Sequence, residues 1–363
     1  MSGLGTEPPG PMATRDHNPT GNGRTRWHGP RSRRGNNGHR ELPMVPDAEF
    51  RSYYGRPVLN PPVWEWKVPA YLFTGGLAAG CSVLGAGADL TGRSALRRAG
   101  RVAALGALLV SVALLIADLG RPERFHLMLR VAKPTSPMSV GTWILTAFGP
   151  GVGLAAATEL LPAHWRRSVI GRLLGRLARP AGLSSAAIAP GVASYTAVLL
   201  SHTAAPGWHE ARGQLPFVFT GSAASSSGGL AMILTPVDEA APARWFATYG
   251  AISELAASRL LQRRLGLVRQ AYTTGRAHRL RSFSEALTTA GLTGTVLAGR
   301  RHRAVAVASG LALLTGSALQ RFGVFEAGVA STKDPKYVIV PQRERRAGRG
   351  TPDAGRGTAP AHY

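Results

Sequence analysis

Long apolar stretches separated by short polar segments follow one another from about residue 68 to residue 323. Each stretch has close to the roughly 20 apolar residues that a helix needs to cross the hydrocarbon core of a bilayer. Eight spans are predicted, at residues 68–89, 101–118, 140–162, 186–205, 215–236, 243–262, 283–299 and 303–323. A large soluble helical protein is the alternative, and eight successive charge-poor spans argue against it. The pattern predicts an all-α, polytopic integral membrane protein.

The spans differ in strength, and two of them share a short sequence. Glu254 and Arg259 interrupt the sixth span and Glu285 the seventh, so these are the weakest.

Residues 72–75 (Leu-Phe-Thr-Gly) and 218–221 (Val-Phe-Thr-Gly) open the first and fifth spans, which run in the same direction. This similarity predicts a parallel repeat of two four-helix bundles, with chance resemblance between Gly-rich helices as the alternative.

Composition divides the chain into three parts. Residues 1–60 are rich in Gly, Pro, Asn and Arg without apolar periodicity, which predicts a disordered tail. Residues 61–325 form the predicted membrane domain, and residues 326–363 a polar C-terminal tail. Inside the spans, Gly76-x-x-x-Gly80 and Gly149-x-x-x-Gly153 predict close approach of neighbouring helices.

The charge balance is strongly basic, with 43 Lys and Arg against 19 Asp and Glu and a net charge of +24. Such a balance is typical of nucleic-acid binders. Here, however, only 17% of residues are charged and 44% are hydrophobic, and most of the arginines lie in tails and loops. Arginine in those places suits anionic lipid headgroups and acidic partner surfaces, so no nucleic acid is needed to explain the charge. Basic loops fall on both sides of the predicted bundle, so they give no orientation.

Cysteine and histidine limit the cofactors that the chain can hold. The single cysteine, Cys81, excludes an intrachain disulfide framework and an iron–sulfur cluster bound by this chain alone. Only His202 lies clearly within a predicted span, whereas a transmembrane b-type haem usually needs paired axial histidines. A haem-bearing, cytochrome-b-like anchor is therefore an alternative and not the leading hypothesis. A lone histidine is more often a packing residue, and His202 is kept as a candidate proton relay.

Carboxylates near the membrane are candidates for proton transfer, because a charged side chain at mid-helix costs at least about 2.5 kcal/mol. Glu254 lies near the middle of the sixth span, which suits either a proton relay or a structural ion pair, for example with Arg259. Asp89, Asp118 and Glu159 end their spans, where carboxylates are ordinarily hydrated at headgroup depth.

The most distinctive polar string, Asp-Leu-Gly-Arg-Pro-Glu-Arg-Phe at residues 118–125, lies between the second and third spans. Its Gly and Pro break the helix, and its arginines can pair with its carboxylates. We expect a polar cap that docks a partner or frames a polar pocket at the membrane surface. The candidate docking residues are Arg121, Glu123, Arg124 and His126.

Two aromatic features complete the pattern. Tyr195 lies about halfway along the fourth span, where its hydroxyl needs a partner that lipid does not offer. Trp64, Glu65, Trp66 and Lys67 precede the first span and suit an aromatic belt with a snorkelling lysine.

Together these strings resemble the NrfD-like membrane subunits, also called polysulfide-reductase membrane subunits, over about residues 60–325. The matching segments are residues 71–80, 118–125, 136–143 and 195–201. The resemblance implies eight to ten helices in four-helix bundles without haem, and a quinone bound near one membrane face. It also implies electron exchange with a docked ferredoxin-type subunit carrying four-iron–four-sulfur clusters. That subunit usually serves a molybdopterin oxidoreductase, such as polysulfide reductase or a formate-dehydrogenase-like enzyme.

The resemblance also implies roles for particular residues. Tyr195 matches the tyrosine that hydrogen-bonds the quinone head group, and Asp118 matches the acidic residue near the quinone or its proton route. The polar residues expected at the start of the first helix are Asn60, Trp64 and Glu65 here. No histidine stands among them, which leaves the second head-group residue open.

The leading hypothesis is a quinone- or quinol-reactive anchor of an oxidoreductase complex in the plasma membrane of a bacterium. It would use menaquinone or another quinone, with Asp118 or Glu254 relaying protons. Electrons must come from a partner subunit, because the chain has no Cys set or His pair to hold a metal. A secondary transporter is the alternative from another class, motivated by the repeat and by Glu254.

Overall fold

The computed structural model describes residues 58–349, and within that range it contains helices and no β-strand. The long helices are α1 (Lys67–Leu90), α2 (Ser94–Asp118), α3 (Pro137–Leu160), α5 (Val169–Ser201), α7 (Leu215–Leu234), α8 (Ala241–Arg264), α10 (Gly275–Leu297) and α11 (Arg303–Lys333). Short helices connect or follow them: η2 (Pro122–Arg130), α4 (Ala163–Arg166), α6 (Pro206–His209), η3 (Gly266–Val268), α9 (Arg269–Thr273) and α12 (Lys336–Arg349). Each predicted span coincides with one long helix, which confirms the all-α polytopic fold. The predicted disorder of residues 1–57 lies outside the described residues.

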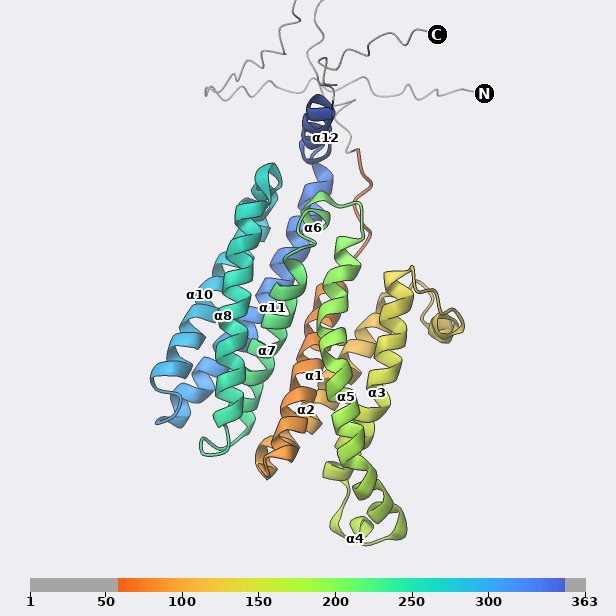
Figure 1. Cartoon of the computed structure of the whole chain (residues 1–363), viewed down its shortest axis with the longest axis vertical. Coiled ribbons are helices and arrows are strands. Elements are labelled where there is room, and N and C mark those ends of the chain that lie inside the picture. The colour runs from red at the N-terminus through yellow and green to blue at the C-terminus, as the bar shows by residue number, and fades with distance from the viewer. Residues whose placement is uncertain (1–57, 350–363) are drawn as a thin grey trace, which may run out of the picture. The chain divides into compact units, whose positions relative to one another are not determined.

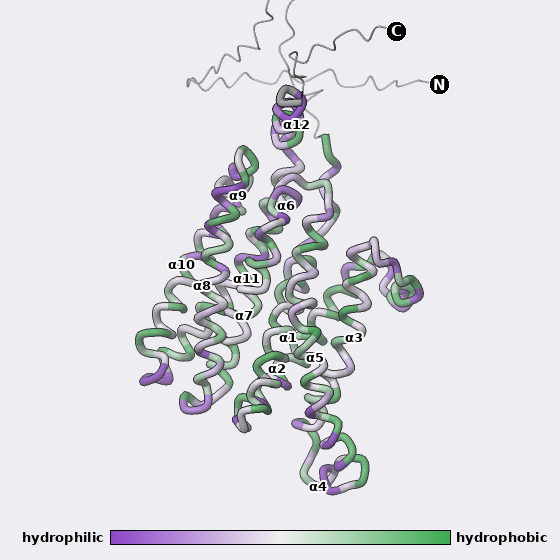
Figure 2. The backbone as a smooth tube through the Cα atoms, in the orientation of Figure 1, coloured by the Kyte–Doolittle hydropathy of each residue, from purple (hydrophilic) through white to green (hydrophobic). Residues whose placement is uncertain are grey.

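Six of the long helices, α1, α2, α3, α5, α7 and α11, are long and apolar enough to cross a membrane. The other two, α8 and α10, have similar lengths but carry more charged residues, as expected for the two weakest spans. Figure 2 shows the same division, with hydrophilic residues gathered at α4, α9 and α12 and hydrophobic residues along the long helices.

The long helices form two halves with the same packing order (Figure 1). In the first half, α1 packs against α2 and α5, and α3 packs against α5. In the second half, α7 packs against α8 and α11, and α10 packs against α11. The halves meet where α7 contacts α1 and α5 and where α11 contacts α1. This common order agrees with the predicted pair of four-helix bundles.

Glycine explains how closely the two halves approach. A Cβ atom at Gly80 would overlap the side chain of Ser227 on α7 and lie 2.8 Å from the Ala223 carbonyl oxygen. The predicted close approach at Gly76-x-x-x-Gly80 is therefore present between α1 and α7. At Gly149 and Gly153 it is absent: the first has only an ordinary contact with Leu108, and a Cβ at the second would meet nothing within 4 Å.

Alternating helix direction gives the bundle two ends, which we name by their short helices. The α6 end holds the start of α1, η2, α6 and α9, and the α4 end holds the opposite turns. At the α6 end, the Tyr272 hydroxyl of α9 donates a hydrogen bond to the Gly207 carbonyl oxygen of α6 at 2.7 Å. Burial raises the pKa of the Tyr272 phenol, so this donor stays protonated.

Four helices run well beyond the predicted spans: α2 and α10 begin at Ser94 and Gly275, before residues 101 and 283, and α5 and α11 extend further still. α5 begins at Val169, well before residue 186, and α11 continues to Lys333, past the expected end of the membrane domain at residue 325. α12 follows within the segment expected to be a polar C-terminal tail. Both extensions are rich in charged or small residues, which lowers their apolar content without preventing a helix.

Candidate functional site

Three polar side chains from different helices meet at the α6 end of the first half. They are Tyr71 of α1, Asp118 at the last position of α2, and Tyr195 of α5. The Tyr71 phenol lies within electrostatic range of both the Tyr195 phenol and the Asp118 carboxylate. Among the described residues, neither tyrosine hydroxyl has a hydrogen-bond partner. The Tyr71 phenol is therefore near both a second phenol without a partner and a carboxylate.

Close packing fixes the orientation of both tyrosines. Tyr71 is 8% exposed, and its carbonyl oxygen accepts a hydrogen bond from the Ser111 hydroxyl of α2 at 3.1 Å. The ring of Tyr195 lies directly against Gly141 of α3, where an added Cβ would overlap the ring. Only glycine leaves this space at residue 141, so the start of α3 determines where the Tyr195 ring lies.

Asp118 adjoins the charged residues that precede α1. Its carboxylate interacts electrostatically with the ammonium of Lys67 and the carboxylate of Glu65. Lys67 Nζ forms an ion pair with Glu65 Oε2 at 3.0 Å. Because Glu65 is exposed and Asp118 half-buried, these groups connect the two phenols with the polar surface at the α6 end.

The other residues predicted before α1 take different places. Trp64 stacks on Trp208 of α6 with ring centroids 5.5 Å apart, and the Trp208 indole N–H donates to the Val324 carbonyl oxygen of α11 at 2.9 Å. Trp64 thus packs at the junction of the halves, within the apolar cluster that also contains Tyr71. Asn60 is exposed.

The loop after α2 differs from the prediction. Arg121, Glu123, Arg124 and His126 are all exposed. Within residues 58–349, neither arginine lies at ion-pair distance from Asp118 or Glu123, so the expected pairing is wrong: Asp118 faces the start of α1 instead. The loop is fixed at its far end, where the Trp143 indole N–H donates to the Val131 carbonyl oxygen at 3.2 Å.

Glu254 of α8 is buried in the second half, and its partner is not Arg259. Arg259 pairs with Glu285 at 3.3 Å, so that predicted pairing is wrong. The Ser317 hydroxyl donates to Glu254 Oε2 at 3.3 Å, and the cation that interacts with the carboxylate is Arg321 of α11. The guanidinium of Arg321 donates to the Phe219 carbonyl oxygen at 2.7 Å. Sequence reasoning missed Arg321, whose only signal was an arginine within a membrane span.

Several polar atoms of this buried pair have no protein partner among the described residues: Glu254 Oε1, Arg321 Nε and Arg321 Nη1. A cavity of about 10 Å³ adjoins Glu254 and is also lined by Ser258 and Gln320. That volume is close to the room that one water molecule needs. A water there would supply the missing hydrogen bond of the carboxylate.

His202 does not lie inside a span. It follows the last residue of α5 as the C-cap, its side chain is exposed, and its Nδ1 lies 3.0 Å from the Val198 carbonyl oxygen. The helix therefore ends just before His202, whereas the predicted span continued to residue 205. Its place at the helix end explains the contact, since the last carbonyls of a helix lack intrahelical partners.

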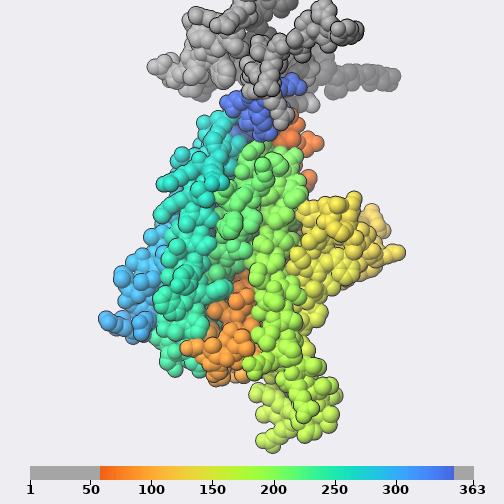
Figure 3. Space-filling view, viewed as in Figure 1, coloured from red at the N-terminus to blue at the C-terminus, as the bar shows by residue number. Residues whose placement is uncertain are grey.

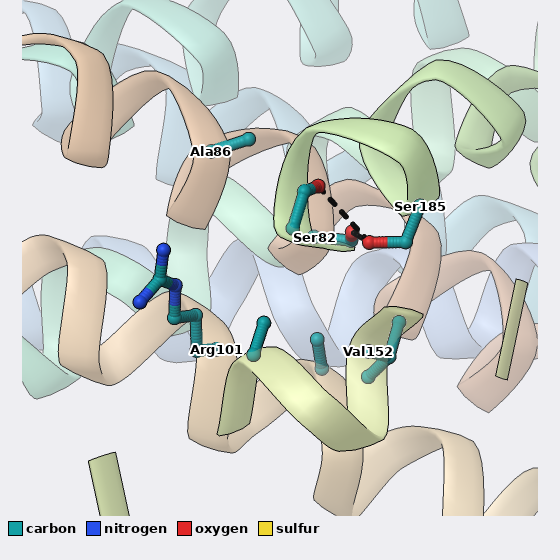
Figure 4. A pocket seen from close by; sticks show the side chains of 8 residues that line it. Ser82, Ala86, Arg101, Val152 and Ser185 are labelled. Atoms are coloured by element: carbon teal, nitrogen blue, oxygen red, sulfur yellow. Dashed lines mark hydrogen bonds between the residues drawn. The ribbon is translucent and has the colours of Figure 1, made fainter. Parts of the chain in front are cut away.

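At the α4 end of the first half, arginines neutralise the two carboxylates that end α1 and α3. Arg101 of α2 lies 3.2 Å from Asp89 and 3.0 Å from Glu159, and Arg97 lies 2.8 Å from Glu159. Figure 4 shows the adjoining cavity of about 10 Å³, where the hydroxyls of Ser82 and Ser185 are 3.1 Å apart. Asp89 and Glu159 thus stabilise the packing of α1, α2 and α3.

Comparison with known proteins agrees with this architecture. A family model described as "Polysulphide reductase, NrfD" matches residues 57–243, which is more than half of the 363-residue chain. The matched region runs from α1 through α7 and includes Tyr71, Asp118, Gly141 and Tyr195. No curated protein matches the sequence.

Proposed function

Because the chain belongs to the polysulphide reductase NrfD family, we propose that it is the quinone- or quinol-reactive subunit of its complex. The family makes the chain an integral membrane subunit of a polysulfide-reductase-like complex that contains molybdoenzyme and iron–sulfur subunits. Our proposal adds the substrate, menaquinone or another quinone, and the site at which it reacts. It also places the complex in the plasma membrane of a bacterium.

The observation that carries the proposal is the meeting of two unpartnered phenols with a carboxylate at one end of the bundle. The hydroxyls of Tyr71 and Tyr195 both lack a hydrogen-bond partner among the described residues. Neither hydroxyl oxygen is fully enclosed by protein, so a ligand can reach both. A bound molecule that offers a carbonyl oxygen to these donors would gain about 1 kcal/mol from each hydrogen bond.

The residues fit a quinone head group, which when bound exchanges two electrons and two protons. Tyr195 and Tyr71 can donate hydrogen bonds to a carbonyl oxygen and so orient the ring. Asp118 can hold a proton next to the phenols and exchange it with the surface past Glu65 and Lys67. Tyr71 supplies the second donor, which the absence of a histidine before α1 had left open.

We assign proton transfer to Asp118 in preference to Glu254. Asp118 lies within electrostatic range of the Tyr71 phenol and of the charged surface residues of the α6 end. Glu254 lies in the second half, where its carboxylate faces Arg321 and Ser317. That setting favours the structural role among the two that its depth allows, and His202 at the exposed end of α5 has no contact that links it to the phenols.

The exposed loop after α2 suits the docking of an iron–sulfur subunit. It leaves the bundle directly after Asp118, and its arginines, Arg121 and Arg124, have no carboxylate partner within the described residues. Phe125 is 45% exposed beside them. An exposed aromatic side chain among unpaired arginines is a common composition of a protein interface. Electrons arriving there would enter close to the phenol pair.

Binding of a menaquinone analogue to the purified full chain tests the proposal. Removing one hydroxyl in Tyr195→Phe or Tyr71→Phe should weaken binding about fivefold, the equivalent of a net hydrogen bond of about 1 kcal/mol. Tyr249→Phe is the matched control, because Tyr249 is 66% exposed on α8 and stacks on Trp245. Equal binding by all three variants would contradict the site.

Function is then measured in the assembled complex. Quinol oxidation should fall in Asp118→Asn, because an amide cannot take up a proton. Unchanged oxidation in Asp118→Asn and Tyr195→Phe would reject both assignments. Uptake of a substrate by the purified chain without a redox partner would instead support the alternative hypothesis, a secondary transporter.

A further inference from the structure

A helical extension protrudes from the α4 end of the first half. α5 has 33 residues, about 50 Å at 1.5 Å per residue, whereas the hydrocarbon core of a bilayer is about 30 Å thick. The apolar part of α5 is its C-terminal portion, so about its first three turns, residues 169–180, extend past the core. Together with α4 they form the segment that we call the α4–α5 extension, residues 163–180. Figures 1 and 3 show this extension standing beyond the ends of α1 and α2.

The extension exposes a strip of large apolar side chains. Val169 is 72% exposed and Ile170 61%, and Leu173 and Leu177 continue the same face of the helix. Trp165 of α4 is 53% exposed next to them. Helical spacing places the four positions on α5 within an arc of about 100°, while Ala178 points to the buried side. Among the described residues, no protein element covers this strip.

Arginines flank the strip. Residues 163–180 contain no acidic residue and five arginines, namely Arg166, Arg167, Arg172, Arg176 and Arg179. Arg179 has a carboxylate partner, Asp89 at 3.7 Å, and Arg166 Nε donates to the Leu161 carbonyl oxygen at 2.8 Å. Within residues 58–349, Arg167, Arg172 and Arg176 have no carboxylate at ion-pair distance, and all three are exposed. The two nearest carboxylates, Asp89 and Glu159, already contact Arg97 and Arg101.

We propose that the α4–α5 extension is a binding surface for anionic phospholipids of the adjacent leaflet. An interfacial helix has apolar side chains at the acyl boundary and basic side chains at the headgroups. Here the apolar strip and the unpaired guanidinium groups stand side by side on one short segment, α4 and the first turns of α5. Because α5 continues directly into the hydrocarbon, the end of the extension nearest the core, with Arg176 and Leu177, lies at the depth of the headgroups, and the rest stands just beyond them.

The partner chemistry follows from the side chains. A guanidinium presents paired N–H donors that match a phosphate diester, and Arg167, Arg172 and Arg176 offer three of them. The apolar strip with Trp165 requires an apolar neighbour next to those phosphates. A phospholipid supplies both in one molecule, whereas free phosphate supplies only the first. Each arginine near an anionic leaflet should raise affinity about fivefold, equivalent to about 1 kcal/mol.

The test uses the full chain in membranes of phosphatidylcholine with one-fifth phosphatidylglycerol. Spin-labelled phosphatidylglycerol and phosphatidylcholine report the selectivity of the lipids in contact with the protein. The wild type should prefer the anionic lipid by well over fivefold. The triple variant Arg167→Gln/Arg172→Gln/Arg176→Gln should lose that preference by at least fivefold, and each single variant should lose part of it.

The matched control removes the same charge at the α6 end: Arg263→Gln/Arg264→Gln/Arg269→Gln, all exposed positions. It should keep the preference. An unchanged preference in the first triple variant, or an equal loss in the control, would overturn the proposal. So would displacement of the lipid by an equal concentration of inorganic phosphate, or loss of a co-purifying protein subunit in the first variant alone with lipid selectivity intact. Helical content by circular dichroism confirms that the variants fold.

Discussion

A methyl group added at Gly141 should disable Tyr195 without changing its chemistry. The new Cβ would lie 2.6 Å from Tyr195 Cδ2 and 3.0 Å from Cζ, and it would overlap Cε2. Carbon atoms pack at about 3.5–4.0 Å, so the ring has to move by about 1 Å. Overpacking of this kind costs about 1–3 kcal/mol. Gly141→Ala therefore shifts the phenol while leaving both tyrosine hydroxyls in the protein.

A shift of about 1 Å is enough to break a hydrogen bond, since O–H···O distances are about 2.5–3.0 Å. Affinity for a menaquinone analogue should fall about fivefold, as in Tyr195→Phe, when measured by calorimetry on the purified full chain. Gly153→Ala is the matched control, because Gly153 lies on the same helix and its added Cβ meets nothing within 4 Å. That variant should bind like the wild type.

The double variant distinguishes displacement of Tyr195 from general damage. If Gly141→Ala acts through the Tyr195 hydroxyl, adding it to Tyr195→Phe should produce little further loss of affinity. Full affinity in Gly141→Ala would refute the packing argument. Losses that multiply in the double variant would show that the alanine acts elsewhere. Thermal unfolding of each variant separates weaker binding from a smaller folded fraction.

Three further predictions concern stability, each measured by the thermal unfolding of the purified chain. Arg321→Gln should destabilise by about 1–3 kcal/mol, because the hydrogen bond to the Phe219 carbonyl oxygen is lost and Glu254 loses the cation that interacts with it, and adding Glu254→Gln should recover part of the loss. Arg303→Gln should cost about 2 kcal/mol, since the Arg303 guanidinium donates to carbonyl oxygens at the end of α7 at 2.7 Å. Trp208→Phe should cost about 1 kcal/mol through loss of the indole hydrogen bond to α11, and a change below about 0.3 kcal/mol would refute that role.

The long helices could be predicted because each contains a long apolar segment that is visible in the sequence. All predicted spans coincide with long helices, and the two interrupted by charge are those that fall short of a membrane span by composition. The predicted boundaries failed where a helix continues beyond the apolar segment that can lie in the membrane. α5 starts at Val169, because its arginine-rich first turns are good helix formers that do not suit hydrocarbon. Hydropathy measures solubility in lipid and does not mark where a helix begins.

The site could be predicted only in part, for a geometric reason. Alternation of helix direction places Asp118 and Tyr195 at one end of the bundle, and the motifs name both. Tyr71 stands in the same motif, but its role depends on how α1 is rotated toward α5, which one sequence does not specify. The same limit applies to Glu254, whose cation lies on α11, 67 residues away at Arg321. Packing determines which distant helix supplies the partner of a buried charge. Local spacing in the sequence favoured Arg259 as the partner of Glu254 instead.

The two halves share one packing order but use it differently. In the second half, buried charges face each other within the protein, as Glu254 and Arg321 do. In the first half, arginines neutralise the carboxylates at the α4 end, which leaves the two phenols at the α6 end as polar groups without a protein partner. The family match ends at residue 243, so it covers this half and α7, the helix that packs against it. Because the two phenols and the family match fall in the same half, that half is where a ligand is expected to bind, and the second half supports it through α7 and α11.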